Sequence, residues 1–149
     1  MKNDIVALAA RVQALEDERA VLSRIYRYAH TTDYGPVEAW VDCFTDDGVL
    51  VHRSRTGRSM GRFEGRAALT DFKAQDMKPP FKYRKHLIIE PVIRMNGAEA
   101  TVVSYYAALR ERDGAPHLSS FGRYLDLLAK CPDGQWRFAE KVIDQEAAG

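Results

Sequence analysis

The sequence predicts an α+β fold in which a curved antiparallel sheet carries helices on its concave side. Two observations lead to this prediction. Apolar residues with helical spacing dominate the first half of the chain, up to about residue 77. Long strand-like segments fill the second half, and turn-forming pairs separate them: Asn96-Gly97, Asp113-Gly114 and Asp133-Gly134. At 149 residues the chain is long enough for one hydrophobic core, so we expect a single domain over residues 1–149.

The first predicted helix spans residues 4–33. An apolar stripe steps along it by three and four residues, interrupted only by Arg19 and Asp33; it comprises Ile5, Leu8, Val12, Leu15, Arg19, Leu22, Tyr26, Ala29 and Asp33. Gly35 and Pro36 end the helix. The negative end of the helix dipole and a partly apolar setting would disfavour ionisation of Asp33, which suits a proton-exchanging carboxylate. The competing interpretation is a surface aspartate beside a turn.

Two shorter helices are expected. One follows Pro36, a favoured first helical residue, and buries Val37, Trp40, Val41 and Phe44. The other runs from Arg66 to about Met77, buries Leu69 and Phe72, and ends at Pro79-Pro80. The first half of the long helix is free to pack on a second subunit as well as on its own sheet.

The segment between the two shorter helices changes character along its length. A turn at residues 45–48 leads into a short strand at residues 49–52. A basic, glycine-rich loop follows at residues 53–66, with a short strand at residues 62–64; its arginines are Arg53, Arg55, Arg58, Arg62 and Arg66. Guanidinium groups bind carboxylates in a fork, so this loop is a candidate lid over an anionic substrate, although such loops are more often only solvated.

Four long strands complete the chain as an antiparallel meander, over residues 82–95, 99–111, about 117–130 and 135–145. Their length exceeds that of ordinary strands, and sheets of that span curl. We therefore expect bulges, one of them at Pro91, and a pocket on the concave side of the sheet.

Composition narrows the function classes. A net charge of +1 disfavours nucleic acid as the main partner, and no apolar run is long enough to cross a membrane. The N-terminus does not resemble a secretion signal, so we expect a cytoplasmic location. Cys43 and Cys131 form neither a disulfide framework nor a metal knuckle.

His86 is the candidate base. It lies early in the first long strand, with Ile88 and Glu90 on the same face by alternation. A carboxylate that holds one imidazole nitrogen fixes the tautomer and raises the basicity of the other nitrogen, so Asp33 and His86 form the pair of interest. Taken alone, a histidine among apolar neighbours is more often a hydrogen-bonded core residue.

Alternation places further side chains on shared strand faces without saying which face points inward. On the second strand, Tyr105 or Tyr106 faces the pocket. On the third strand one face carries His117, Phe121 and Arg123, and the competing face carries Gly122, Tyr124 and Asp126. The predicted substrate-binding residues are Tyr26, His30, Trp40, Glu90, Tyr105, His117, Phe121 and Arg123.

Other chemistries find less support in the sequence. His30, Asp33, His86 and His117 are a conceivable metal set, but no histidine pair has ligand spacing. No nucleophile elbow and no glycine-rich phosphate cradle are present in the sequence. We infer neither a metal nor a cofactor.

Several segments together resemble the SnoaL-like branch of the nuclear-transport-factor-2-like (NTF2-like) superfamily. The resemblance implies a cystatin-like α+β barrel, in which a curved antiparallel sheet forms a cone closed by three helices. They span nearly the whole chain: Arg27-Tyr28-Ala29, Asp33, Phe44-Thr45-Asp46-Asp47-Gly48, Gly65-Arg66, Lys85-His86, Gly122-Arg123-Tyr124-Leu125-Asp126 and Asp133-Gly134-Gln135-Trp136-Arg137. Their order and spacing are fairly specific for the fold and much less specific for an activity, since one fold hosts many functions.

The resemblance also implies a site. Scytalone dehydratase, bile-acid 7-alpha-dehydratase and the lindane dehydrochlorinase of this superfamily are cofactor-free lyases with an Asp–His dyad. Asp33 and His86 match that dyad by position, and Tyr28 matches a tyrosine of the bile-acid enzyme. Helical phase instead favours Tyr26 beside Asp33, because Tyr28 lies about 140° away on an ideal helix. Glu90 and Arg123 stand where relatives vary, which leaves the substrate open.

We therefore expect a cofactor-independent lyase that acts on a small cyclic or aromatic hydrophobic substrate, with Asp33, His86 and Tyr28 as catalytic residues. Isomerisation or polyketide-type cyclisation uses the same parts. The alternative from another class is a non-catalytic ligand-binding module or a partner subunit like the β subunits of ring-hydroxylating dioxygenases. The resemblance also implies a homo-oligomer, a dimer or trimer.

Overall fold

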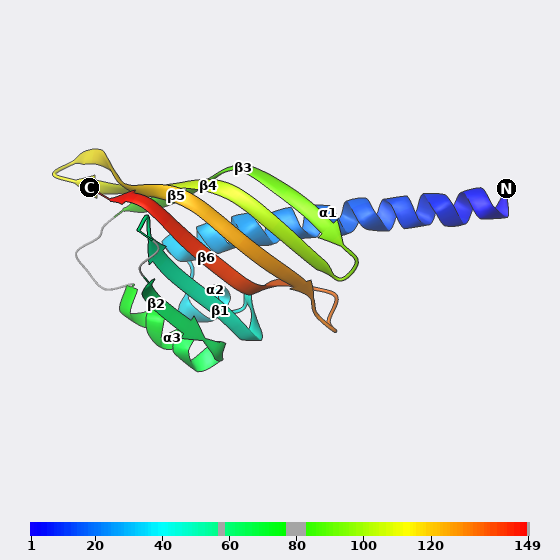
Figure 1. The fold of residues 1–149 in the computed structure, drawn as a ribbon, viewed down its shortest axis with the longest axis horizontal. Helices are drawn as coiled ribbons and strands as arrows, with labels where there is room; N and C mark the ends of the chain where they lie inside the picture. Colours follow the sequence, from blue (N-terminus) through cyan, green and yellow to red (C-terminus); the bar gives the residue numbers. More distant parts are fainter. Residues whose placement is uncertain (57–58, 77–82, 149) are drawn as a thin grey trace.

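A computed structural model describes residues 1–56, 59–76 and 83–148, and it confirms the predicted α+β fold with a curved sheet (Figure 1). The elements in chain order are α1 (Lys2–Tyr34), α2 (Val37–Val41), β1 (Phe44–Ser54), β2 (Ser59–Glu64), α3 (Gly65–Asp76), β3 (Arg84–Asn96), β4 (Glu99–Arg112), β5 (Ala115–Lys130) and β6 (Trp136–Ala148). No helix in the described part of the chain is long and apolar enough to span a membrane.

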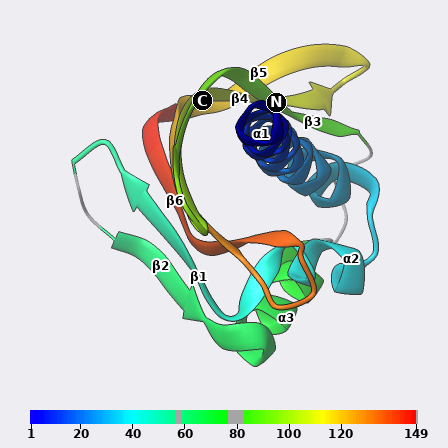
Figure 2. The same ribbon diagram turned by 90° about the vertical axis from the view of Figure 1, so that its right-hand side faces the viewer.

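The six strands form one sheet in the order β2-β1-β6-β5-β4-β3. Strands β3 to β6 make the predicted antiparallel meander. Strand β1 pairs with β6 in parallel, a long-range pairing that the sequence did not reveal, and β2 extends the sheet as a hairpin with β1. Figure 2 shows the sheet curving around α1, with α2 and α3 on the remaining open side. The concave face of the sheet is therefore enclosed by helices.

Irregular pairing accompanies the curvature. The bulge expected at Pro91 is present, as a register shift between Ile89 and Val92 with Glu90 at a positive φ of 50°. A second shift lies at Gly122 on β5, where a Cβ atom would collide with the carbonyl oxygen of Asp144 on β6. Only glycine permits this close approach of the two strands.

Two predicted boundaries change. The expected turn at residues 45–48 belongs to β1, whose register with β6 shifts between Phe44 and Val49. The short strand expected at residues 62–64 begins earlier, because β2 runs from Ser59 to Glu64. The predictions for Arg58, for the helix end at Met77 with Pro79-Pro80 and for the strand start at residue 82 lie outside the described residues.

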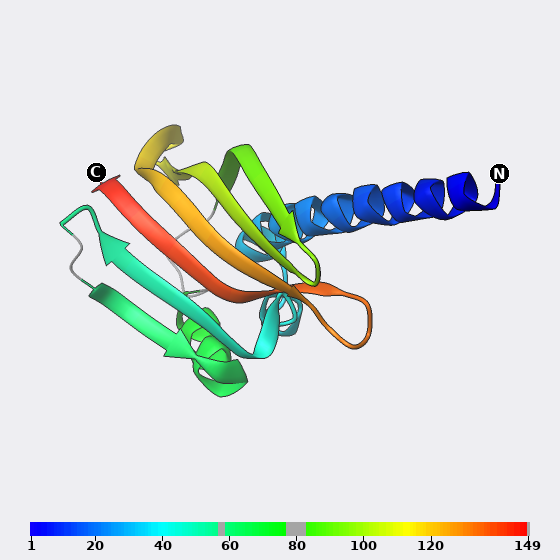
Figure 3. The ribbon, with the colours of Figure 1, turned by 45° about the vertical axis from the view of Figure 1, so that its right-hand side comes forward.

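Helix α1 has two halves with different surroundings. Its first half projects beyond the sheet (Figure 3) and exposes its apolar side chains, among them Ile5, Leu8, Val12 and Leu15. Its second half buries Val21, Arg24, Ile25, Tyr28, Ala29, Thr31 and Thr32. Beyond residue 20 the predicted stripe is therefore right for Ala29, which is buried, and wrong for Tyr26, which is exposed, because polar residues occupy part of the buried face.

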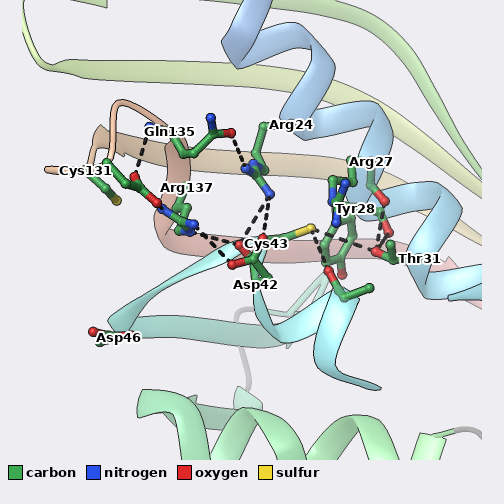
Figure 4. Close-up of polar contacts among 12 residues, drawn as sticks. Arg24, Arg27, Tyr28, Thr31, Asp42, Cys43, Asp46, Cys131, Gln135 and Arg137 are labelled. Atoms are coloured by element: carbon green, nitrogen blue, oxygen red, sulfur yellow. Dashed lines mark hydrogen bonds and ion pairs between the residues drawn. The ribbon is translucent and has the colours of Figure 1, made fainter. Parts of the chain in front are cut away.

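Arg24 anchors this second half to the residues just after α2 and just before β6 (Figure 4). The buried guanidinium donates to the carbonyl oxygen of Asp42 and to the side chain of Gln135, both at 3.3 Å. Arg137 on β6 holds the Asp42 carboxylate from the other side, at 3.1 Å. These contacts fix the rotation of α1, and Tyr28 follows one helical turn later on the same face.

Candidate functional site

A cavity of about 230 Å³ lies between the three helices and the concave face of the sheet. Aromatic rings form much of its wall: Tyr28, Trp40, Phe72, Tyr106 and Tyr124. Polar groups also line it: His52, Asp76, His86, Arg110, Ser120 and Gln145. The volume is below the roughly 300–1,000 Å³ of a usual ligand pocket, so the cavity suits one small ring system.

The structure brings Asp33 and His86 together at this cavity. Oδ1 of Asp33 lies 2.6 Å from Nδ1 of His86, and Oδ2 accepts the backbone N–H of His86 at 2.9 Å. The Asp33 side chain is 5% exposed and that of His86 is 19% exposed. Oδ1 thus orients the imidazole and Oδ2 binds the backbone of β3, whereas Nε2 makes no hydrogen bond to any described residue. This arrangement leaves Nε2 to a substrate, and a catalytic role for the pair stays a prediction.

Two cations hold the end of α1 next to Asp33. The carbonyl oxygen of Thr32 accepts from Lys73 Nζ at 2.7 Å and from Arg84 Nη2 at 2.6 Å. Arg84 Nε also lies 3.9 Å from Asp33 Oδ1, and Asp76 accepts from Arg84 at 2.8 Å. Cations at a helix C-terminus satisfy its last carbonyls and its dipole. Sequence reasoning missed Lys73 and Arg84, since neither stands out in a motif.

Tyr28 lines the cavity, whereas Tyr26 is 42% exposed and does not. Of these two tyrosines, Tyr28 is therefore the one that faces inward. The same helix directs Asp33 toward β3. The Tyr28 ring packs against Trp40, with centroids 5.8 Å apart, and edge-on against Phe138. Burial raises the pKa of Tyr28, so its phenol stays protonated and is a hydrogen-bond donor.

A fully buried ion pair lies behind the cavity wall. Lys141 Nζ is 3.0 and 3.1 Å from the two carboxylate oxygens of Asp126, and neither side chain is exposed. The ammonium also lies 4.4 Å from the ring centroid of Tyr28 and 3.8 Å from that of Tyr124. The pair therefore supports two of the aromatic side chains that line the cavity.

Several predicted substrate contacts do not line this cavity. Trp40 does, but Tyr26, His30, Tyr105, Phe121 and Arg123 are exposed. On β4 and β5 the inward face is the alternative one, with Tyr106, Gly122, Tyr124 and Asp126. Alternation identifies side chains that share a face but not the direction in which that face points. Arg123 instead pairs with Asp144 at 2.8 Å on the outer face.

Two further predictions are corrected by local geometry. Glu90 was expected beside His86, but the bulge breaks the alternation and leaves Glu90 exposed. His117 is exposed and lines an adjoining cavity of about 690 Å³ beside the turn between β4 and β5, which shares Arg110, Ser120 and Gln145 with the inner one. The structure therefore does not gather His30, Asp33, His86 and His117 into the set considered for a metal.

Sequence reasoning also missed His52, Asp76, Ser120 and Gln145 as cavity residues. His52 Nε2 lies 3.1 Å from Oε1 of Gln145, which joins β1 to β6 at the wall. Alternation from the buried Leu50 would have pointed to His52. The contribution of Gln145 depends on the parallel pairing of β1 with β6.

The arginines of the basic loop are largely engaged by the protein itself. Arg53 donates to Asp144 at 2.9 Å. Arg62 donates to Glu64 at 3.1 Å, and Arg66 donates to Asp46 at 3.3 Å. The Arg53 contact joins β1 to β6 and the Arg66 contact joins α3 to β1, whereas the Arg62 contact stays within β2. Arg58 lies outside the described residues.

Comparison with known families places these features in context. The family model for the SnoaL-like domain matches residues 13–142. A comparison with curated proteins gives no significant match.

Solved structures show the same fold. The β subunit of a proposed aromatic-ring-hydroxylating dioxygenase from Novosphingobium aromaticivorans is similar with a TM-score of 0.80 and 19% identity, over 91% of this chain and 93% of that one. A proposed scytalone dehydratase from the same organism gives 0.78 and 20%, over 91% and 88%. An NTF2-like protein with a cystatin-like fold, also from that organism, gives 0.78 and 22%, over 93% and 87%.

Proposed function

The chain belongs to the SnoaL-like domain family, and from this premise we propose that it is a cofactor-independent lyase acting on a small cyclic or aromatic substrate. The fold hosts dehydratases, isomerases and cyclases as well as dioxygenase β subunits. The observation that supports an enzyme is the Asp33–His86 hydrogen bond of 2.6 Å beside a partly aromatic cavity. A histidine with only a structural role has no need of a cavity beside its second ring nitrogen, Nε2.

The proposed reaction is a proton-transfer elimination. His86 Nε2 takes a proton from a carbon atom of the substrate, and Asp33 stabilises the resulting imidazolium. The electron pair of the C–H bond becomes the new C=C bond as the adjacent C–O bond breaks. The leaving oxygen keeps the C–O electron pair, receives the proton from His86 and departs as water. Tyr28 donates a hydrogen bond to that oxygen as negative charge develops on it.

The same groups perform an isomerisation or a cyclisation when the proton returns to another atom of the substrate. In an isomerisation, the imidazolium of His86 gives the proton back to a different carbon of the substrate, so that the double bond moves. In a cyclisation, the carbanion attacks a carbonyl carbon within the same substrate, the C=O π electrons move to oxygen, and the resulting alkoxide takes the proton from His86. These reactions differ from the elimination only in the fate of the proton and the electron pair.

A non-catalytic partner subunit is the second candidate, and it would bind a larger protein through an apolar surface on the outer face of the sheet. We name this surface the outer sheet patch; it comprises Leu87, Ile89, Val103, Tyr105 and Phe121, each about two-fifths exposed or more. Neighbouring strands place these side chains together, since Ile89 pairs with Tyr105. Such a patch suits another protein surface. A second copy of this chain would also cover this patch, and we propose such self-association alongside the lyase activity.

The experiment measures dehydration of 3-hydroxycyclohexanone by ultraviolet absorbance of the enone, and deuterium uptake by 2-tetralone in D₂O by NMR. The wild-type protein should accelerate at least one of them. His86→Ala and Asp33→Asn should each lower the rate by about 100-fold or more while circular dichroism stays native. His30→Ala, which changes an exposed histidine on the same helix as Asp33, should keep the full rate.

Two outcomes would count against the lyase. A folded His86→Ala variant with the wild-type rate would exclude this mechanism. A wild-type protein that accelerates neither reaction, and that co-purifies with a larger subunit, would favour the partner-subunit reading.

A further inference from the structure

The projecting first half of α1 carries a row of apolar side chains that lie in solvent (Figure 3). Each of the four is between 46% and 68% exposed: Ile5, Leu8, Val12 and Leu15. Single exposed apolar residues are normal on a protein surface, but a row of them along one helix marks a contact site. None of the four lines the cavity, so the row has a purpose other than the proposed reaction.

The spacing of this row is that of a coiled coil. Its members alternate steps of three and four residues, as the a and d positions of a heptad do, and the same steps continue to Arg19 and Leu22. We name residues 5, 8, 12, 15, 19 and 22 the heptad stripe. Its first two a positions hold the β-branched residues Ile5 and Val12, and every d position holds leucine. In parallel coiled coils this combination favours two strands.

The heptad stripe also lies on the side of α1 that is free for pairing. Asp17 faces the protein's own sheet, since its carboxylate accepts from Lys130 Nζ at 2.7 Å and from Trp136 Nε1 at 3.1 Å. At about 100° per residue, Val12 and Leu15 lie about 140° and 160° from Asp17 around the helix. Two α1 helices can therefore approach along the heptad stripe while each keeps its own sheet on the far side.

The charges beside the heptad stripe favour a parallel pair. In a parallel coiled coil, the g residue of one helix meets the e residue of the next heptad on the other helix. Arg11 therefore meets Glu16 of the second copy, and symmetry repeats this contact on the other side of the pair. The two other contacts of this kind bring no like charges together: Asp4 with Ala9, and Glu18 with Ser23.

An antiparallel pair would bring like charges together. With Leu8 opposite Val12 of the second copy, g residues meet g residues, so Arg11 would face Arg11, and Asp4 would face Glu18. Like charges at facing positions destabilise paired helices. The charge pattern therefore selects the parallel orientation.

We propose that α1 forms a parallel two-stranded coiled coil with α1 of a second copy of this chain, over residues 5–22. The contact is separate from the outer sheet patch, which lies on β3, β4 and β5. Residues 5–22 span about two and a half heptads, so the coiled coil is weak and forms in concentrated protein. Arg19, a single polar residue at an a position, fixes the register at a cost in stability. The inference does not depend on the lyase activity.

Disulfide trapping in the full-length chain tests this pairing, because it captures even a weak contact. Leu8 occupies a d position, where two parallel helices place identical residues opposite each other. Under mild oxidation of concentrated protein, Leu8→Cys should form a crosslinked dimer at least about 10-fold faster than Ala10→Cys. Ala10 is the matched control because it is also exposed and lies about 160° from Leu8 around the helix. Both variants carry Cys131→Ser, which removes a partly exposed native cysteine.

The charge pattern supplies a second test. Arg11→Glu places carboxylates opposite Glu16 of the second copy and should slow the crosslinking of Leu8→Cys by about 3- to 10-fold. The double change Arg11→Glu/Glu16→Arg makes the facing charges opposite again and should restore the rate. Circular dichroism should stay native throughout, because the replaced side chains are exposed.

Three results would overturn the proposal. Equal crosslinking rates for Leu8→Cys and Ala10→Cys would show that the heptad stripe does not pair with itself and would leave it to a different protein. Crosslinking in a mixture of Leu8→Cys and Val12→Cys, but not of Leu8→Cys alone, would reveal an antiparallel pair. A double variant that stays as slow as Arg11→Glu would contradict the contact of Arg11 with Glu16 that selects the parallel orientation.

Discussion

Lys141 and Asp126 form an ion pair that water does not reach, directly behind the aromatic wall of the cavity. Burial raises the pKa of Asp126 and lowers that of Lys141, so the charges persist only because each compensates the other. Both tyrosine rings above the ammonium line the cavity. The geometry of the site therefore depends on a pair that contacts no substrate.

Lys141→Met should destabilise the protein strongly, because it leaves the Asp126 carboxylate buried without a counter-charge. We expect a loss of about 3–5 kcal/mol in the free energy of unfolding, measured by urea titration. The double variant Lys141→Met/Asp126→Leu should regain most of this loss. As a control, Arg123→Met removes an ion pair whose arginine is 45% exposed and should cost less than about 1 kcal/mol. A Lys141→Met variant as stable as the wild type would show that the folded state does not depend on the buried ion pair.

The C-terminal end of α1 and the helix α3 form one unit through Lys73. This lysine comes from α3, is fully buried, and donates to Thr32 of α1 at 2.7 Å. Burial lowers the pKa of Lys73 from its usual value near 10.5 to about 8, an effect that Arg84 reinforces and that Asp76 and Asp33 oppose. The C-terminal end of α1, which carries Asp33, is thus held by an amine whose pKa is about 8.

Stability should rise with pH between about 8 and 10.5. In this window the unfolded chain still binds a proton at Lys73 and the folded chain does not, so unfolding becomes less favourable as pH increases. The gain approaches about 3 kcal/mol at the upper limit and disappears below pH 8, where both states are protonated. Urea titrations of the wild type and of Lys73→Met across this range give the measurement. If the free energy of unfolding changed with pH in the same way for the wild type and for Lys73→Met, the lowered pKa of Lys73 would be refuted.

At the scale of the whole molecule, two apolar surfaces lie outside the core. One is the outer sheet patch, and the other is the first half of α1, which projects past the sheet (Figure 1). Contiguous apolar patches on folded proteins mark contact sites. We propose that the outer sheet patch joins copies of this chain sheet to sheet, which leaves the cavity on the opposite, concave face free for substrate.

Size-exclusion chromatography with light scattering checks this assembly. The wild type should run as a dimer or trimer, and Tyr105→Glu should shift it to the monomer, since a charge at the centre of the patch cannot be desolvated without a partner. His30→Glu, an exposed change on α1, should leave the assembly intact. A monomeric wild type, or a Tyr105→Glu variant that stays associated, would rule out the sheet-to-sheet contact.

Local patterns in the sequence were sufficient for the helices and the antiparallel meander. The Asn96-Gly97 and Asp133-Gly134 turns, and strands too long to stay flat, led to a curled meander with a bulge at Pro91, as the structure confirms. Those signals are local because a turn needs particular backbone angles and a long sheet must twist. The resemblance, rather than periodicity, singled out Tyr28 as the tyrosine to place beside the cavity.

Tertiary structure alone decided which side chains meet. Alternation could not say that Tyr106 and Tyr124, rather than Tyr105 and Phe121, face inward, because both faces of these strands carry aromatic residues. Alternation also could not predict that the bulge leaves Glu90 exposed instead of beside His86. Nor could it predict that the parallel pairing of β1 with β6 places Gln145 in the cavity wall. The sequence determined the elements and named the Asp33–His86 pair. The curvature of the sheet, a sum of many long-range pairings, determined what surrounds that pair.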